Sequence, residues 1–176
     1  MRVLGIDPGS EVTGWGVVEG DANGRSYRLI EFGAIRLKSG STFSSRLLKI
    51  SRALHEIITR LKPDACAIEE AFLATNPKVT VKLGQVRGVA LLMAESAALE
   101  IGEYAPRSIK QTVAGYGNAE KRQVQEMVRL LLSLPSVPEP HDAADALAVA
   151  ICHFHHAGIN QRLAAAAGSS RRRSLR

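Results

Sequence analysis

The sequence predicts an α/β domain whose core is a five-stranded sheet. Runs of strand-forming residues recur along the chain, at 3–7, 14–18, 27–37, 65–70 and 101–105. Longer stretches with apolar residues at helical spacing separate or follow these runs. With 176 residues, of which 45% are hydrophobic, the chain has the size of one domain with an ordinary core.

The first strand ends in an unexpected residue. The apolar run 3–6 suits a buried strand, whereas Asp7 is costly to bury without a partner. Pro8 and Gly9 break the strand, so we expect Asp7 at a strand end, facing a cleft. A turn-forming Asp before Pro-Gly is the simpler alternative. The link to the second strand is too short for a parallel crossover, so these two strands are expected to be antiparallel.

The middle of the chain alternates helices and strands. After a turn at 21–24 and the third strand, a helix capped by Ser44 or Ser45 is expected to end at Leu61. A strand on each side of this helix implies a parallel pair with a right-handed crossover. A long helix over about 78–100 carries a row of small residues, which favours close packing on another helix, within the monomer or across a two-fold axis. The row is Gly84, Gly88, Ala90, Ala94 and Ala98.

The C-terminal part is expected to be mostly helical. Helices over 107–114 and 120–132 flank a glycine joint, with Asn118 as the N-cap of the second. Prolines stiffen the loop that follows, and the last helix runs from about Asp142 to His156. The chain thus divides into a domain of residues 1–157 and a basic, disordered tail of residues 158–176.

Composition narrows the partners and the location. A net charge of +6 and a sequence pI near 9.7 favour a polyanionic partner. We find no run of about 18 apolar residues and no secretory leader, so we expect no membrane partner and a cytoplasmic location. Cys66 and Cys152 are interpreted as buried apolar residues in a reducing compartment, outside any ligand-spaced cluster.

Four carboxylates stand out by position: Asp7, Glu69, Asp142 and Asp145. The first two end apolar strands, and the last two lie three residues apart at a helix start, on one face. An acid such as Asp142 also suits the first turn of any helix. Asp145 lies on an otherwise apolar helix and needs a partner. Glu69 and Glu70 point to opposite sides of a strand, and the pattern does not choose between them.

Such a cluster of acids favours metal chemistry. Clustered carboxylates repel one another unless a cation lies among them, and hard oxygen ligands suit Mg²⁺ or Mn²⁺. Two such ions can clamp the attacking and leaving oxygens of a phosphodiester displacement. A basic protein with an acidic metal pocket is therefore a candidate nuclease. His141 is either a proton carrier, a ligand or a plain loop histidine, whereas the three histidines at 153–156 are interpreted as structural.

Several segments, taken together, closely resemble the RuvC family of bacterial Holliday junction resolvases. They follow one another from Met1 to about His156, which makes the match more specific than any one motif. The matching segments are Gly5-Ile6-Asp7-Pro8-Gly9, Thr13-Gly14-Trp15-Gly16, Ala67-Ile68-Glu69-Glu70-Ala71-Phe72, Lys82-Leu83-Gly84-Gln85-Val86-Arg87-Gly88-Val89-Ala90, Lys110-Gln111-Thr112-Val113-Ala114-Gly115-Tyr116-Gly117, Ala119-Glu120-Lys121 and Asp142-Ala143-Ala144-Asp145-Ala146-Leu147-Ala148.

The resemblance implies a fold, a substrate and partners. The fold is ribonuclease-H-like, with a mixed five-stranded sheet flanked by helices. The function is that of a homodimer that binds four-way DNA junctions in recombination and repair and nicks two strands symmetrically. A further implied partner is the RuvA-RuvB branch-migration complex.

The resemblance also assigns residues. The family's four acids fall on Asp7, Glu69, Asp142 and Asp145, which selects Glu69 over Glu70. Some members carry His where this chain has Asp142; here the histidine lies one place earlier.

DNA contacts are implied at five further positions. The family's junction-facing aromatic falls on Phe72, which follows the catalytic strand and is suited to stacking on unpaired bases, although a core anchor is the alternative. The family's basic residues fall on Lys110 and Lys121, although a lysine on a helix is often merely solvated. Lys82 and Arg87, in the matching long-helix segment, complete the expected DNA contacts.

The expected mechanism is hydrolysis by metal-activated water, without a covalent intermediate. Asp7 is expected to bridge two Mg²⁺ ions, for which Mn²⁺ substitutes, with Glu69 and Asp145 completing one or both sites. Asp142 would ligate a metal or help to deprotonate the water, and Lys110 or Lys121 would steady the scissile phosphate. Three rivals compete: an actin-like ATPase, a related nuclease acting on RNA, and a junction-binding module without catalysis.

Overall fold

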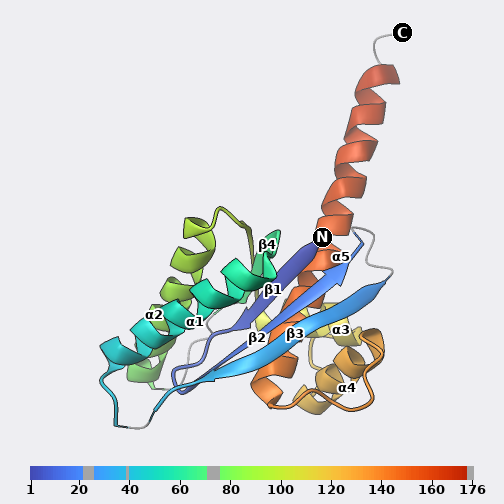
Figure 1. Ribbon diagram of the computed structural model, residues 1–176. Helices are drawn as coiled ribbons and strands as arrows, with labels where there is room; N and C mark the ends of the chain where they lie inside the picture. The colour runs from blue at the N-terminus through green and yellow to red at the C-terminus, as the bar shows by residue number, and fades with distance from the viewer. Residues whose placement is uncertain (22–25, 39, 71–75, 174–176) are drawn as a thin grey trace.

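A mixed five-stranded sheet forms the middle layer of the molecule (Figure 1). The computed structural model describes residues 1–21, 26–38, 40–70 and 76–173, the part from 160 onward as helical backbone alone. The strand order is β3-β2-β1-β4-β5; the β1–β2 and β2–β3 pairs are antiparallel, and the β1–β4 and β4–β5 pairs are parallel. The predicted mixed sheet is therefore confirmed. The strands are β1 (Arg2–Asp7), β2 (Val12–Gly20), β3 (Tyr27–Arg36), β4 (Ala65–Glu69) and β5 (Glu100–Tyr104).

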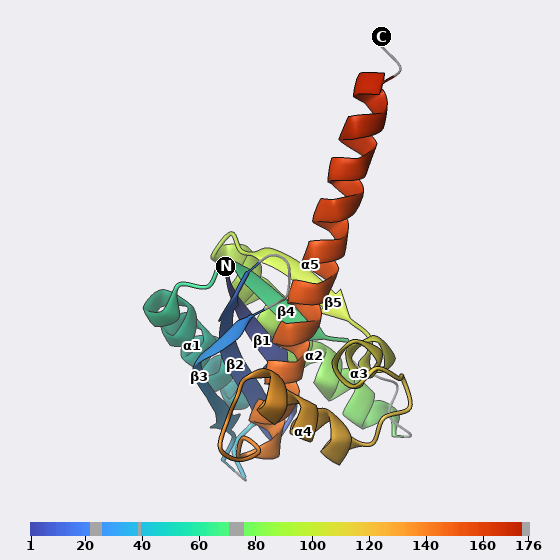
Figure 2. The ribbon, with the colours of Figure 1, turned by 90° about the vertical axis from the view of Figure 1, so that its right-hand side faces the viewer.

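Helices cover both faces of the sheet (Figures 1 and 2). On one face, α1 (Phe43–Leu61) and α2 (Pro77–Ser96) pack against Leu4 and Ile6 of β1. The other face carries α3 (Pro106–Ala114), α4 (Lys121–Leu131) and α5 (His141–Arg173). Because side chains alternate along a strand, Val3 and Asp7 face α5 when Leu4 and Ile6 face α1 and α2.

Helix α5 lies directly on β1 and β2 because glycines face it there. A Cβ on Gly5 would lie 2.0 Å from the carbonyl oxygen of Ala146, and a Cβ on Gly14 would lie 1.9 Å from that of Asp142. Any side chain at these two strand positions would push the helix away. The glycines of the first two motifs thus bring the start of α5 to the end of β1, where Asp7 lies.

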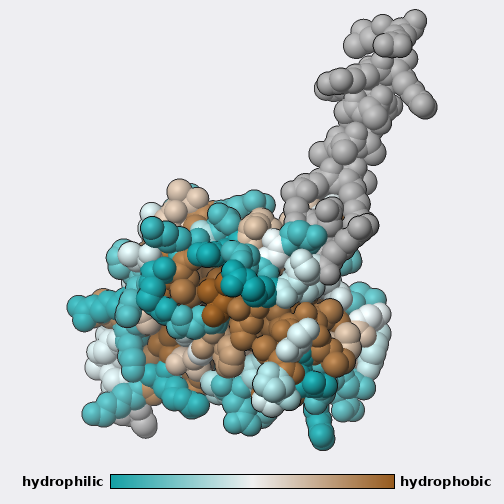
Figure 3. Space-filling model, turned by 45° about the vertical axis from the view of Figure 1, so that its right-hand side comes forward, coloured by the Kyte–Doolittle hydropathy of each residue, from teal (hydrophilic) through white to brown (hydrophobic). Residues whose placement is uncertain are grey.

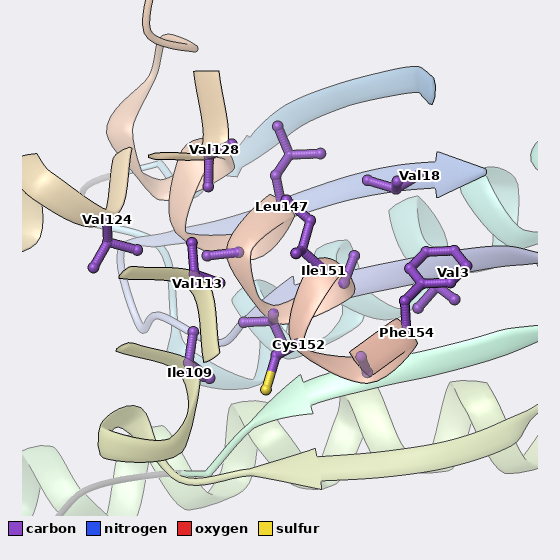
Figure 4. Packing of buried hydrophobic residues seen from close by; sticks show 14 of the residues in the cluster. Val3, Val18, Ile109, Val113, Val124, Val128, Leu147, Ile151, Cys152 and Phe154 are labelled. Carbon is purple, nitrogen blue, oxygen red and sulfur yellow. The ribbon is translucent and has the colours of Figure 1, made fainter. Parts of the chain in front are cut away.

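The core on this face joins α3, α4 and α5 to the sheet (Figure 4). Helix α5 fills its centre, where Leu147, Ile151 and Phe154 are at most 2% exposed. Because these large apolar side chains are almost fully buried, they hold α5 firmly on the sheet and give the site a rigid support. The residues that meet it are Val3 and Val18 from the sheet, Ile109 and Val113 from α3, and Val124 and Val128 from α4.

Three predicted helix ends differ from the structure. The N-cap of α1 is Thr42, whose Oγ1 accepts a hydrogen bond from the backbone N–H of Ser45 at 3.3 Å, so neither Ser44 nor Ser45 caps it. Helix α2 ends at Ser96, four residues before the predicted end, and Ala98 has a φ of 54°. The N-cap of α4 is Glu120 instead of Asn118. The backbone N–H of Glu120 donates a hydrogen bond to the side chain of Gln123 at 2.8 Å.

The prediction for the end of the last helix was wrong. Helix α5 continues from His141 to Arg173 and so extends 17 residues beyond the predicted end at His156. Alanine has the highest helix propensity of all residue types, so the alanine run 164–167 explains why α5 continues beyond the predicted end. The second half of α5 projects away from the body (Figures 1 and 2). The division between a domain of residues 1–157 and a separate tail stays a prediction.

The small-residue row of α2 is divided between two faces. Ala90 and Ala94 are buried in the core beside α1, which meets the predicted packing within the monomer. A Cβ on Gly84 or Gly88 would have no atom of the described residues within 4 Å. Among the described residues, nothing covers this second face of α2, which also carries the exposed side chains of Val81 and Leu92.

The face of the molecule drawn in Figure 3 carries both hydrophobic and hydrophilic residues. Within the described part of the chain, no helix is both long and apolar enough to cross a bilayer. Cys66 and Cys152 are buried free thiols, and burial raises the pKa of each, to about 12 and about 11. Both cysteines therefore behave as apolar core residues, as predicted.

Candidate active site

A pocket of about 320 Å³ opens where β1 and β4 end and α5 begins. Three of the four predicted acids line it: Asp7, Glu69 and Asp145. Two lysines, Lys110 of α3 and Lys121 of α4, share the lining with a few apolar residues. The pocket thus combines acidic side chains from three elements with cations from two others.

The register of the parallel pair brings the first two acids together. Ile6 of β1 is paired with Ile68 of β4, so the next residues, Asp7 and Glu69, end neighbouring strands on the same face. Glu69 is part of the pocket lining, whereas Glu70 is exposed and its backbone N–H is bound to the Tyr104 carbonyl at 2.9 Å. The sequence pattern could not tell which of Glu69 and Glu70 faces the pocket, and the structure shows that it is Glu69.

The other two acids arrive on the first turns of α5. Asp145 is part of the pocket lining, and its side chain is 16% exposed. Asp142, three residues earlier, is half-buried and outside the lining, although its charge acts on both Asp7 and Lys121. The Asp142 carbonyl packs closely against Gly14, and this contact sets the distance between the first turn of α5 and β2.

Burial changes the ionisation of Asp7 and Glu69. Desolvation is the largest cause that raises the pKa of Asp7, to about 6, with the charges of Asp145 and Asp142 adding to it. Desolvation also raises the pKa of Glu69, to about 8, followed by the charge of Asp7. A hydrogen bond between the two side chains lowers the pKa of Asp7 and raises that of Glu69, so the two carboxyls titrate as a linked pair.

Asp145 is held by two partners from α4. The Lys121 ammonium lies 2.6 Å from Asp145 Oδ2, and the Gln125 amide donates to Asp145 Oδ1 at 3.2 Å. Burial lowers the pKa of Lys121, but the ion pair with Asp145 and the charges of Asp7 and Asp142 outweigh this, so the pKa is raised. Lys121 is therefore a firmly charged cation among the acids.

The chemistry of this donor set fits a hard divalent cation. Among the described residues, no three His, Cys, Asp or Glu side chains are arranged to hold a metal ion as they stand. Instead, the Lys121 ammonium compensates part of the charge of acids that supply only oxygen donors, and the raised pKa values of Asp7 and Glu69 show that their charged forms are disfavoured without a cation. Oxygen-only donors at high negative charge suit Mg²⁺ or Mn²⁺.

Two polar residues of the site were missed in the sequence. Thr13 is fully buried, and its hydroxyl donates to the Gly9 carbonyl at 3.0 Å, which ties the loop after Asp7. Gln125 is 5% exposed beside Val124 and Val128. A polar residue on the apolar face of a helix, four residues after Lys121, is the signal that would have found Gln125.

The remaining predicted residues lie at different places. Lys82 is outside this pocket, with its Nζ 5.8 Å from the ring centre of Phe43. Arg87 is also outside it and forms an ion pair with Glu103 that joins α2 to β5. Phe72 lies outside the described residues.

The histidines fall into two groups. His141 is exposed at the first residue of α5. His153 is buried and its Nδ1 lies 3.0 Å from the Tyr104 hydroxyl, as a structural residue would.

Comparison with known proteins identifies the family. The family model described as crossover junction endodeoxyribonuclease RuvC matches residues 3–153. The chain belongs to the RuvC family. The RuvC proteins of Chloroflexus aggregans and Koribacter versatilis are 52% and 48% identical to it, over 92% and 95% of this chain and 98% and 100% of theirs. The RuvC of Thermus thermophilus in complex with a Holliday junction substrate superposes with a TM-score of 0.84 at 34% identity, covering 91% of this chain and 96% of that one.

The fold is shared more widely than the sequence. The yeast mitochondrial Holliday junction resolvase Ydc2 superposes with a TM-score of 0.64 at 16% identity, over 91% of this chain and 81% of its own. At that identity the likeness concerns the fold alone. The RuvC match therefore rests on sequence and structure together, over nearly the whole chain.

The raised pKa values of Asp7 and Glu69 predict a pH-dependent stability. A carboxyl whose folded pKa exceeds its unfolded value favours the folded state at low pH, and this contribution is lost as pH rises through the folded pKa. Without metal, in EDTA, we expect the free energy of unfolding to fall by roughly 5 kcal/mol between pH 5 and pH 9. Mg²⁺ should restore more stability at pH 9 than at pH 5. A matching pH profile in Glu69→Gln would contradict this origin.

Proposed function

We propose that this RuvC-family protein is a metal-dependent endonuclease that resolves four-way DNA junctions by nicking two strands symmetrically. The observation that carries the proposal is the convergence of Asp7, Glu69 and Asp145 on one pocket beside Lys121, in a chain that matches the RuvC family from residue 3 to 153. The Thermus thermophilus relative was solved with a Holliday junction substrate. Recombination and DNA repair are the processes in which such junctions arise.

The acids and lysines have distinct roles in this proposal. Asp7, Glu69, Asp142 and Asp145 would hold two Mg²⁺ ions, for which Mn²⁺ would substitute. When bound, such ions stabilise the attacking and leaving oxygens of a phosphodiester displacement. Lys121, which is ion-paired with Asp145, and Lys110 of α3 would both contact the scissile phosphate from the pocket wall.

Other residues of the protein keep this pocket organised. The buried face of α5 holds Asp145 against the sheet, and the Thr13 hydroxyl keeps the loop after Asp7 in place. We also propose that Phe72, Lys82 and Arg87 contact DNA. Lys82 is exposed, and Arg87 forms an ion pair with Glu103.

A cleavage assay on defined DNA tests the function. A fixed four-way junction, a duplex of the same arm sequence and an RNA–DNA hybrid are incubated with the protein and Mg²⁺, and the products are mapped on a sequencing gel. We expect paired nicks at symmetric positions in the junction, with little cutting of the other two. Equal cutting of the duplex or preferred cutting of the hybrid would contradict junction selectivity.

We propose that the protein acts as a homodimer through the open face of α2. Val81 and Leu92 on this helix are 61% and 63% exposed, and Gly84 and Gly88 lie between them. A row of two large apolar side chains with glycines between them allows a second helix to approach closely. A two-fold pair of pockets would then match paired strands of a junction.

The dimer predicts the effect of a charge on this face. Leu92→Glu should convert a particle of about twice 18.9 kDa into a monomer of 18.9 kDa in light scattering, because a buried charge at the interface costs several kcal/mol. Leu48→Glu on α1, also at an exposed leucine (51%), is the matched control and should stay dimeric. A Leu92→Glu protein that remains dimeric would rule out this face.

The proposal extends to location and further partners. A bacterial enzyme that acts on chromosomal DNA works in the cytoplasm, and a branch-migration complex of the RuvA-RuvB kind would supply its junctions. The arginines near the C-terminus add charge suited to DNA phosphates.

A further inference from the structure

Gln125 is a buried polar residue in an apolar setting. It lies on the second turn of α4 with 5% of its surface exposed, next to Val124, which is likewise 5% exposed. Among the described residues only Thr13 and His153 are comparably buried polar side chains. Burying an amide without a hydrogen-bond partner is costly, so the partner that Gln125 has indicates why a glutamine lies there.

The partner of Gln125 is one oxygen of Asp145. Its Nε2 donates to Asp145 Oδ1 at 3.2 Å, while Lys121, one turn earlier on the same helix, approaches Asp145 Oδ2 at 2.6 Å. The two oxygens of this carboxylate are thereby divided between a neutral buried donor and a cation. The Lys121 side chain is 62% exposed to solvent, whereas Gln125 is enclosed by the core.

We propose that Gln125 is the positioning residue of Asp145: its amide fixes the rotation of the carboxylate so that Oδ2 stays turned into the pocket for a cation. The terminal torsion of an aspartate is broad and roughly two-fold, so a carboxylate without such a bond samples many orientations. A donor on the second oxygen removes this freedom before any metal binds. The inference rests on the proposed role of Asp145 as a metal ligand.

A structural role and a positioning role differ in what they change. If Gln125 only satisfies its own burial, its loss lowers thermal stability and leaves metal binding unchanged. If it positions Asp145, its loss weakens metal binding by about 10–100-fold, as for other residues that orient a ligand. Cleavage at saturating Mg²⁺ should then change by less than about 5-fold, because the ligand itself is still present.

The test compares two glutamines on one helix. In the full-length protein without DNA, Mn²⁺ binding is measured by titration calorimetry for wild type, Gln125→Met and Gln123→Met. Gln123 accepts the Glu120 N–H at 2.8 Å and caps the same helix without touching Asp145. We expect Gln123→Met to bind Mn²⁺ as wild type does and Gln125→Met to bind it 10–100-fold more weakly, with the Mg²⁺ concentration for half-maximal cleavage raised in proportion. Gln125→Leu, which also lacks a donor, replaces Gln125→Met if the latter does not fold.

Asp145→Asn separates the two levels of the proposal. If Asp145→Asn weakens Mn²⁺ binding and adding Gln125→Met weakens it no further, Gln125 acts through Asp145. If Asp145→Asn weakens binding but Gln125→Met binds Mn²⁺ within 2-fold of wild type, the positioning role is overturned and the metal site stands. If Asp145→Asn binds Mn²⁺ as wild type does, both are overturned.

Discussion

Asp7→Asn is expected to abolish junction cleavage while leaving junction binding intact. Asp7 shares its hydrogen bond with Glu69 in the pocket, and asparagine preserves the shape but removes the charge that attracts a divalent cation. Loss of this electrostatic stabilisation should reduce the cleavage rate by at least about 10³-fold. A gel-shift titration in EDTA together with single-turnover cleavage in Mg²⁺ measures both quantities.

The matched control for Asp7→Asn is Asp64→Asn. Asp64 is an exposed aspartate just before β4, where its Oδ2 accepts the Arg2 N–H at 2.7 Å. This variant should cut at the wild-type rate. An Asp7→Asn protein that cuts junctions at a normal rate would remove the metal pocket from the mechanism. A variant that also failed to bind junctions would point to a folding defect, which thermal unfolding would reveal.

Gly14→Ala is expected to damage both stability and cleavage. The new Cβ would lie 1.9 Å from the Asp142 carbonyl oxygen and 2.4 Å from its carbon, so the first turn of α5 must move. Backbone on backbone cannot be relieved by a rotamer change, and we expect a loss of about 3 kcal/mol or more in unfolding free energy. Displacing Asp142 and Asp145 by about 1 Å should lower cleavage by about 10²-fold at a temperature where the variant is folded.

Gly16→Ala on the same strand and face is the comparison. Its Cβ would meet the Leu147 side chain, 2.5 Å from Cδ2, and a side chain can shift where a backbone cannot. The expected loss is about 1–2 kcal/mol, with cleavage nearly preserved because Leu147 is not in the pocket lining. Chemical denaturation and single-turnover cleavage measure the two effects. Equal losses in the two variants would contradict the view that glycine at 14 sets the position of the acids.

The sequence predicted the elements well where periodicity and sharp breakers coincide. Pro8 after β1 and Pro63 after α1 end their elements at the predicted places, and alternation along β4 reduced its pocket-facing acid to Glu69 or Glu70. Helix ends were less predictable, because Ser44, Ser45 and Thr42 are all good N-caps and only the local hydrogen bonds select Thr42. The length of α5 was misjudged for a similar reason: helix propensity in an alanine run competes with terminal fraying, and a pattern does not weigh the two.

The amino-acid sequence by itself determined the strand-borne Asp7, the acids at the start of the last helix, and the family, because these depend on local order along the chain. Only the tertiary structure decided that Gly14 seats Asp142 against β2, that Lys121 and Gln125 divide the oxygens of Asp145, and that Arg87 is bound to Glu103. The physical reason is that such pairings join residues distant in sequence. They depend on the distances of α4 and α5 from the sheet, and the periodicity of residues within a single segment does not predict those distances.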